Sequence, residues 1–127
     1  MTAQLNHTIV ASSDREKAAA FLTEMLGLPE APVFGPFRVV ELGNGASLDF
    51  MAVGEDVVPQ HYAFLVSEDE FDDIFGRIKD RGLDHWADPH RNEPGTINTH
   101  DGGRGVYWEH PDGHLLEIIT RPYGSGS

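Results

Sequence analysis

The chain has 127 residues, of which 39% are hydrophobic and 24% charged, a composition typical of one soluble globular domain. Its formal charge of −12 opposes binding to nucleic acid or to an anionic membrane surface. The absence of cysteine excludes disulfides, thiolate catalysis and cysteine-ligated zinc. No apolar stretch approaches the roughly 20 residues that span a bilayer, and no secretion signal is recognisable, so we expect a cytoplasmic protein.

The first predicted element is a short strand in LNHTIV, which carries His7. Ser13 and Glu16 follow at the spacing of a capping box. Behind them, four apolar residues recur at helical spacing: Ala18, Phe21, Leu22 and Met25. Gly27 predicts the end of this helix. The runs FRVVEL and ASLDFMAV then predict two strands joined by a Gly-Asn-Gly turn.

The same order of elements returns in the second half of the chain. QHYAFLV predicts a strand that carries His61, and Ser67 and Glu70 repeat the capping-box spacing. Apolar residues again recur at helical spacing, at Phe71, Ile74, Phe75 and Ile78. Gly82 predicts the end of the helix, and GVYWEH and HLLEIIT predict strands joined by a Pro-Asp-Gly turn.

These landmarks indicate two copies of a strand–helix–strands unit, at about residues 5–54 and 60–122. We therefore predict an α+β fold with a single domain over residues 1–122, in which two tandem βαβββ units form curved mixed sheets around a cleft. Residues 123–127 are expected to form a flexible tail. The second unit carries extra residues at roughly 88–103, and long loops of this kind in compact domains are often functional.

Glu117 interrupts the apolar run Leu-Leu-Glu-Ile-Ile, where burial of an unpaired carboxylate is costly. Because side chains alternate along a strand, His7, His61 and Glu117 each share a face with apolar neighbours, in equivalent positions of the two units. Each of the three taken alone fits an ordinary strand residue, but their equivalent placement favours a metal site. Two histidines and one carboxylate suit Fe²⁺, Mn²⁺ or Zn²⁺ and leave positions open for substrate or oxygen. We predict one divalent ion in the cleft, whose charge keeps Glu117 ionised.

The LNHTIV and QHYAFLV starts and the VYWEHPDGHLLEI ending resemble the vicinal oxygen chelate superfamily, over about residues 5–122. This superfamily includes glyoxalase I, extradiol dioxygenases, fosfomycin resistance enzymes and bleomycin resistance proteins. The most recognisable motif is Pro-Asp-Gly-x-x-x-Glu, from Pro111 to Glu117. The resemblance implies metal ligands on the first strand of each unit and on the last strand of the second. These places are His7, His61 and Glu117, the residues chosen above.

Asp49, Tyr107 and His100 bear on the reaction. Asp49 holds the place of the fourth ligand of glyoxalase I-like enzymes, but it is one methylene shorter and fits a solvent-facing carboxylate equally well. Tyr107 stands ten residues before Glu117, where the resemblance implies a tyrosine that hydrogen-bonds the substrate in extradiol enzymes. His100 is the nearest candidate for their acid/base. We favour a ring-cleaving dioxygenase with Fe²⁺, with Mn²⁺, Ni²⁺ or Zn²⁺ as alternatives, over a glyoxalase-like lyase.

Other members of the superfamily remain as alternatives. A fosfomycin-type enzyme uses the same three ligands, but recognition of a phosphonate favours several cationic side chains, and the candidates are Arg91, Arg104 and Arg121. A non-catalytic antibiotic-binding resistance protein is opposed by the intact ligand set. His110 and His114 beside the turn are expected to be solvated. We expect a small-molecule substrate, a homodimer, and no nucleic-acid or membrane partner, with pairing of the units within one chain or between chains left open.

Overall fold

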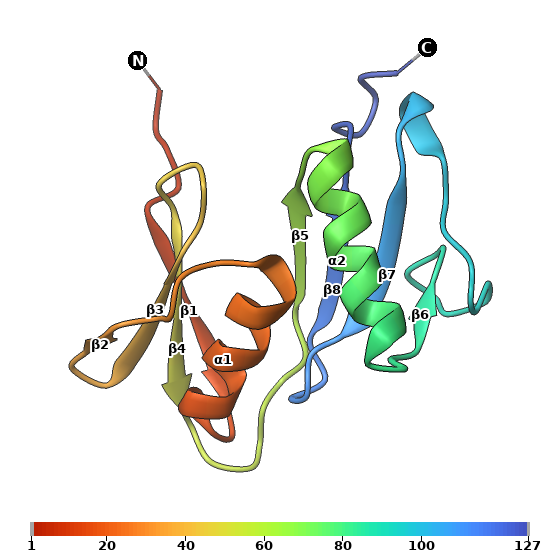
Figure 1. The fold of residues 1–127 in the computed structure, drawn as a ribbon. Coiled ribbons are helices and arrows are strands. Elements are labelled where there is room, and N and C mark those ends of the chain that lie inside the picture. The colour runs from red at the N-terminus through yellow and green to blue at the C-terminus, as the bar shows by residue number, and fades with distance from the viewer. Residues whose placement is uncertain (1, 127) are drawn as a thin grey trace. The chain divides into compact units, whose positions relative to one another are not determined.

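The computed structural model describes residues 2–126. The chain divides into two compact units, residues 1–58 and 59–127, and each holds a four-stranded mixed sheet and a long helix (Figure 1). Both units follow the order strand, helix, three strands, so the predicted α+β fold of two tandem βαβββ units is confirmed. Within residues 2–126 no helix is long and apolar enough to cross a membrane.

The first unit consists of β1 (His7–Ser12), α1 (Arg15–Leu26), β2 (Val33–Phe34), β3 (Phe37–Glu41) and β4 (Ser47–Ala52). Its strand order is β1-β4-β3-β2, in which β1 is parallel to β4 and the other neighbours are antiparallel. Helix α1 packs on β3 and β4. The core of this unit is formed by buried side chains of the helix and of one sheet face: Val10, Leu22, Met25, Val40, Leu48 and Phe50.

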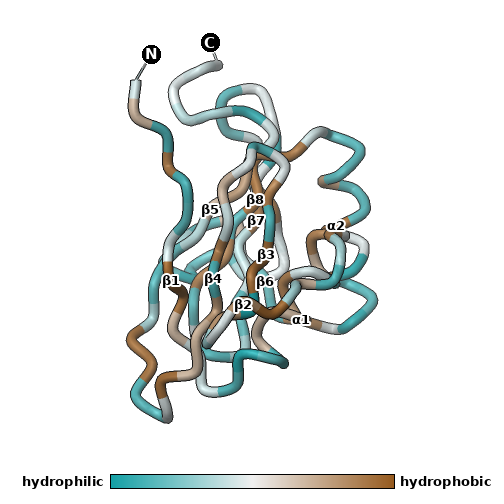
Figure 2. Tube along the Cα trace, turned by 90° about the vertical axis from the view of Figure 1, so that its left-hand side faces the viewer, coloured by the Kyte–Doolittle hydropathy of each residue, from teal (hydrophilic) through white to brown (hydrophobic). Residues whose placement is uncertain are grey.

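The second unit consists of β5 (His61–Leu65), α2 (Glu68–Asp80), β6 (His85–Trp86), a 3-10 turn (His100–Gly102), β7 (Gly105–Glu109) and β8 (Leu115–Ile119). Its strand order, β5-β8-β7-β6 with β5 parallel to β8, repeats the topology of the first unit. In Figure 2, α2 is mostly hydrophilic, with hydrophobic residues between the hydrophilic ones. The buried core residues are Phe71, Ile74, Ile78, Val106, Trp108, Leu116 and Ile118.

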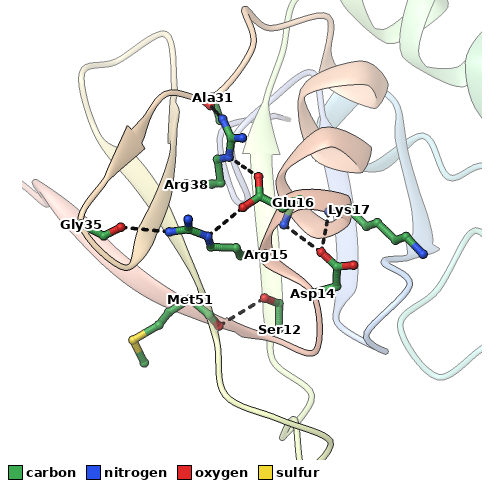
Figure 3. A network of polar contacts seen from close by, with 9 residues as sticks. All are labelled: Ser12, Asp14, Arg15, Glu16, Lys17, Ala31, Gly35, Arg38 and Met51. Carbon is green, nitrogen blue, oxygen red and sulfur yellow. Dashed lines mark hydrogen bonds and ion pairs between the residues drawn. The ribbon is translucent and has the colours of Figure 1, made fainter.

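The start of α1 differs from the sequence-based prediction. Ser13 and Glu16 were expected to form a capping box, and this is wrong, because Asp14 is the N-cap. Its Oδ1 accepts the backbone N–H groups of Glu16 and Lys17 at 3.0 and 3.2 Å (Figure 3). The Glu16 side chain pairs with Arg38 instead. A carboxylate at the N-cap satisfies two free N–H donors and lies at the positive end of the helix dipole.

The start of α2 and the ends of both helices agree with the sequence-based predictions. The Ser67 side chain accepts the backbone N–H of Glu70, and the Glu70 carboxylate accepts the backbone N–H of Ser67, which completes the predicted capping box. Gly27 and Gly82 adopt positive φ values of 69° and 63° just beyond the helices. Only a residue without a Cβ takes this conformation at little cost, which explains why both helices end there.

The turns before the last strands of the two units have the same geometry. Gly45 and Gly113 have positive φ values of 88° and 91°. A backbone hydrogen bond of 2.8 Å closes each turn. The N–H of Leu42 donates to the carbonyl oxygen of Ala46, and that of His110 to the carbonyl oxygen of His114. Asp49 and Glu117 each follow four residues later, so the two carboxylates occupy equivalent places in the duplicated fold.

His110 and His114 flank the second turn, and the expectation that they are solvated is wrong. They are 3% and 1% exposed. Nδ1 of His110 accepts the backbone N–H of Asp112 at 3.1 Å, and Nδ1 of His114 accepts that of Gln60 at 3.0 Å. Each buried ring accepts a backbone N–H group, His110 from within the turn and His114 from the residue before β5, so His114 ties the turn to the start of that strand.

Candidate metal centre

The predicted metal ligands on the strands lie on the sheet faces opposite the buried cores. In each sheet, the histidine of the first strand pairs with a residue of the last strand. The carboxylate residue follows two positions after that paired residue. His7 pairs with Ser47, two residues before Asp49, and His61 pairs with Leu115, two residues before Glu117. Since residues two apart share a face, each histidine lies on the same face as the carboxylate of its own unit. The register therefore places Asp49 and Glu117 identically.

In the second unit, His61 and Glu117 are in direct contact. Nε2 of His61 lies 3.0 Å from Oε1 of Glu117, and Nδ1 lies 3.0 Å from the carbonyl oxygen of Leu115. Glu117 is completely buried, whereas 45% of the His61 side chain is exposed. The backbone thus holds one nitrogen of the imidazole and turns the other toward a buried carboxylate.

The hydrogen bonds of His61 call for a positive charge between the ring and Glu117. A carbonyl oxygen only accepts, so Nδ1 carries a proton and donates it to Leu115. In a neutral imidazole Nε2 then has a lone pair, which would face the lone pairs of the carboxylate. A proton or a metal ion between the two atoms resolves this repulsion. Metal-binding histidines usually donate their other N–H to such a carbonyl, so this donor set fits a divalent ion.

Two tyrosines complete the surroundings of Glu117. Tyr107 on β7 stacks on His61 with ring centroids 5.9 Å apart, and its hydroxyl lies 3.2 Å from that of Tyr123. The Tyr123 hydroxyl donates a hydrogen bond to Oε2 of Glu117. Burial raises the pKa of Tyr107 and of Tyr123, and the bond to Glu117 raises the pKa of Tyr123 further. Both phenols therefore keep their protons at neutral pH.

Sequence reasoning missed Tyr123. A single tyrosine after the last strand has no periodicity and no motif spacing, and it falls in residues 123–127, the segment expected to be flexible. The available signal was the Pro-Tyr-Gly-Ser run, which is typical of a β-turn. The expected flexibility concerns motion and stays a prediction, and Ser127 lies outside the described residues.

In the first unit, His7 and Asp49 have separate partners. Nδ1 of His7 lies 2.7 Å from the side-chain oxygen of Asn6, which makes Nδ1 the donor and leaves the lone pair on Nε2, as in His61. Asp49 is half-buried and accepts a hydrogen bond from the Ser47 hydroxyl at 2.8 Å. His7 is exposed, and its role as a ligand stays a prediction.

The structure brings two of the three predicted ligands together. His61 and Glu117 belong to the second unit and His7 to the first. Within either unit, the described residues hold no group of three or more His, Asp or Glu side chains that could bind a metal ion. The complete ligand set stays a prediction. His100 is exposed at the 3-10 turn, where its backbone N–H bonds Asn98, and its catalytic role stays a prediction too.

The family can be stated from this fold together with the sequence. Residues 4–118 match the Glyoxalase/Bleomycin resistance protein/Dioxygenase superfamily. The match covers most of the chain, and the tandem βαβββ units agree with it. The chain belongs to this superfamily, as the sequence motifs predicted.

Three known proteins are similar over nearly the whole chain. The structure of Oxidase ChaP-H1 is 63% identical, with a TM-score of 0.95 and coverage of 97% of this chain and 99% of that one. Oxidase ChaP-H2 is 60% identical, with a TM-score of 0.97 and full coverage of both chains. Glutathione transferase FosA of Serratia marcescens is 30% identical over 124 residues, which are 93% of this chain and 81% of that protein.

Proposed function

We propose that the protein is a divalent-metal-dependent enzyme of the vicinal oxygen chelate type that oxidises a small molecule with two adjacent oxygens. Ring-cleaving, extradiol-type dioxygenase chemistry is the favoured reaction. The observation that carries this proposal is the His61–Glu117 pair, in which Nε2 and Oε1 lie 3.0 Å apart in an arrangement that suits a bound cation. Similarity to two proteins named as oxidases, at 63% and 60% identity, supports chemistry with oxygen.

The residues have distinct roles in this proposal. His7, His61 and Glu117 hold the ion, which we propose is Fe²⁺, with Mn²⁺, Ni²⁺ or Zn²⁺ as alternatives. When bound, the ion would act as a Lewis acid toward oxygen atoms of the substrate. The protonated Tyr107 hydroxyl donates a hydrogen bond to a substrate oxygen that gains negative charge. His100, on the loop before β7, takes up or releases a proton.

Metal content tests the first part of the proposal. Purified protein is expected to contain a stoichiometric divalent ion by elemental analysis, and His7→Ala, His61→Ala and Glu117→Ala should each lose it, because each removes a ligand. His85→Ala is the matched control: Nδ1 of His85 also bonds a backbone carbonyl, at 3.1 Å, but it lies on β6 and should leave the ion in place. Full occupancy in any of the first three variants removes that residue from the site.

Oxygen dependence tests the second part. Turnover of a catechol-type probe should consume O₂ and stop under anaerobic conditions. Full anaerobic turnover excludes a dioxygenase. A metal-free protein that binds an aromatic drug without turnover supports the non-catalytic resistance class instead.

Glyoxalase I-like lyase chemistry is the second candidate. The observation in its favour is Asp49, which occupies the same register position in its sheet as Glu117. A carboxylate there provides a fourth ligand if it reaches the ion. Its bond to Ser47 at 2.8 Å directs it to its own strand, and for this reason we rank this candidate below the dioxygenase.

Transfer chemistry of the fosfomycin-resistance type is supported by the 30% identity to FosA. Recognition of a phosphonate needs cationic side chains free to bind it. Arg91 is paired with Glu109 at 2.5 Å, and Arg104 with Glu68 and Asp72 at 2.8 Å each. These carboxylates already neutralise two of the three candidate arginines, which favours the oxidase.

A further inference from the structure

We propose that Tyr123 is a positioning residue of the metal centre, which fixes the Glu117 carboxylate so that Oε1 faces the ion. This inference rests on the proposed function. The two oxygens of Glu117 have different surroundings: Oε1 lies 3.0 Å from Nε2 of His61, and Oε2 accepts the Tyr123 hydroxyl. With one oxygen held by a phenol, the carboxylate presents a single oxygen as ligand, and the outer hydrogen bond sets its orientation.

The C-terminal segment is built to hold Tyr123 in this place. Residues 122–125 form a turn in which the backbone N–H of Ser125 donates to the carbonyl oxygen of Pro122 at 3.1 Å. Gly124 has a φ of 77°, as the third position of a type II turn requires, and this places Tyr123 at the second position. Beyond the turn, the N–H of Gly126 bonds Oδ1 of Asp101 at 3.2 Å. Tyr123 thus lies in a hydrogen-bonded turn whose following residue is bonded to Asp101, and from this exposed segment its side chain reaches a buried group.

The hydrogen bonds have a defined direction. A carboxylate only accepts, so the Tyr123 proton is committed to Glu117. The hydroxyl of Tyr107, 3.2 Å away, must then donate to the oxygen of Tyr123. Tyr123 therefore also gives the Tyr107 proton an acceptor before a substrate oxygen replaces it. Loss of the Tyr123 hydroxyl frees Oε2 of Glu117 to bind the ion together with Oε1, and removes Tyr123 as the acceptor of the Tyr107 proton.

Tyr123→Phe, titrated with Co²⁺ after removal of the native metal, tests this role. The dissociation constant for Co²⁺ should rise about 10- to 100-fold, the range for loss of a group that orients a ligand. The visible absorption of bound Co²⁺ should weaken, because a second carboxylate oxygen raises the coordination number. Tyr62→Phe is the matched control, since it removes a phenol on β5 at a residue next to His61 in sequence, and it should change neither quantity.

Gly124→Ala provides an independent variant that keeps the phenol. A Cβ is strained at a φ of 77°, so the turn loosens and Co²⁺ affinity should fall in the same direction, by less than in Tyr123→Phe.

The outcomes separate this inference from the proposed function. Unchanged Co²⁺ affinity and spectrum in Tyr123→Phe, together with loss of Co²⁺ in Glu117→Ala, overturn the role of Tyr123 and leave the metal centre standing. Wild-type protein that binds no Co²⁺ overturns both.

Discussion

Asp49 and Glu117 occupy equivalent positions in their sheets but make different contacts. Both follow a glycine turn, and both lie at the same register position relative to the histidine of the first strand. Glu117 reaches His61 at 3.0 Å, whereas Asp49 bonds Ser47 on its own strand at 2.8 Å. The shorter side chain ends closer to its own backbone, so equivalent positions carry different contacts.

Asp49→Ala separates the two enzyme reactions by metal content. If the ion has three protein ligands, elemental analysis should find the same metal occupancy in this variant as in the wild type. A large loss of metal is the expected result for a glyoxalase-like site with four ligands, and it would contradict the favoured reading. Asp49→Asn, which keeps the size and removes the charge, controls for packing.

Tyr107→Phe should lower the turnover number by about 10- to 1000-fold, because it removes a hydrogen bond to charge that develops on the substrate. Metal content should stay unchanged, since the phenol is no ligand in the proposal. Steady-state kinetics with the metal-loaded protein measures this effect. Normal turnover in Tyr107→Phe would assign Tyr107 to packing against His61 alone.

At the scale of elements, the two helices start in different ways although the units repeat. A serine that accepts one backbone N–H group of the first turn begins α2, and an aspartate that accepts two begins α1. The Glu16 side chain does not take part in the cap. It pairs with Arg38 on β3 and so links α1 to its own sheet (Figure 3). The unit therefore keeps a contact between helix and sheet that a capping box would not provide.

Asp14→Ala should lower the free energy of unfolding by about 1 kcal/mol, because the N–H groups of Glu16 and Lys17 lose their acceptor. Urea unfolding followed by circular dichroism measures this change. Asp14→Asn keeps an acceptor oxygen and should retain most of the stability. Equal losses in the two variants would assign the effect to the charge at the helix end.

Acid should remove the contribution of Glu16 to stability. The hydrogen bond from Arg38 lowers the pKa of Glu16 below its ordinary value of 4.5. A carboxyl group with a lower pKa in the folded state stabilises the fold above its unfolded pKa, and this stabilisation is lost as pH falls through the folded value. Urea unfolding of wild type and Glu16→Gln should therefore converge in stability below about pH 4.5, and a constant difference across that range would contradict this.

At the scale of the whole molecule, the faces that carry the predicted ligands also carry exposed apolar side chains. Ile9 is 50% exposed on the face of His7, and Leu65 is 62% exposed on the face of His61. Strands β1 and β5 are terminal strands in the order of their sheets. Exposed apolar surface and terminal strands favour association with a further chain.

We expect a homodimer, since cyclic dimers are the commonest assembly of a single chain. Analytical ultracentrifugation should give about twice the chain mass of 14.0 kDa. A mass of 14.0 kDa at micromolar concentration would contradict this prediction.

The sequence by itself determined the duplication, the helix ends, the turns and the family. These features depend on contacts between near neighbours in the chain: Gly27 and Gly82 end helices because they lack a Cβ, and the Pro-Asp-Gly turn sets the place of Glu117 four residues later. Alternation along a strand then places His61 and Glu117 on one face, which the register confirms.

Only the tertiary structure decided which groups surround Glu117. Tyr123 reaches it from a segment without periodicity, and Tyr107 stacks on His61 from a neighbouring strand. His110 and His114 are buried, and each accepts a backbone N–H group, although nothing in their local sequence indicates burial. Such contacts depend on the directions of side chains that fold back on one another. The spacing of residues along the sequence does not indicate those directions, so only the three-dimensional structure identifies the polar partners of the candidate site.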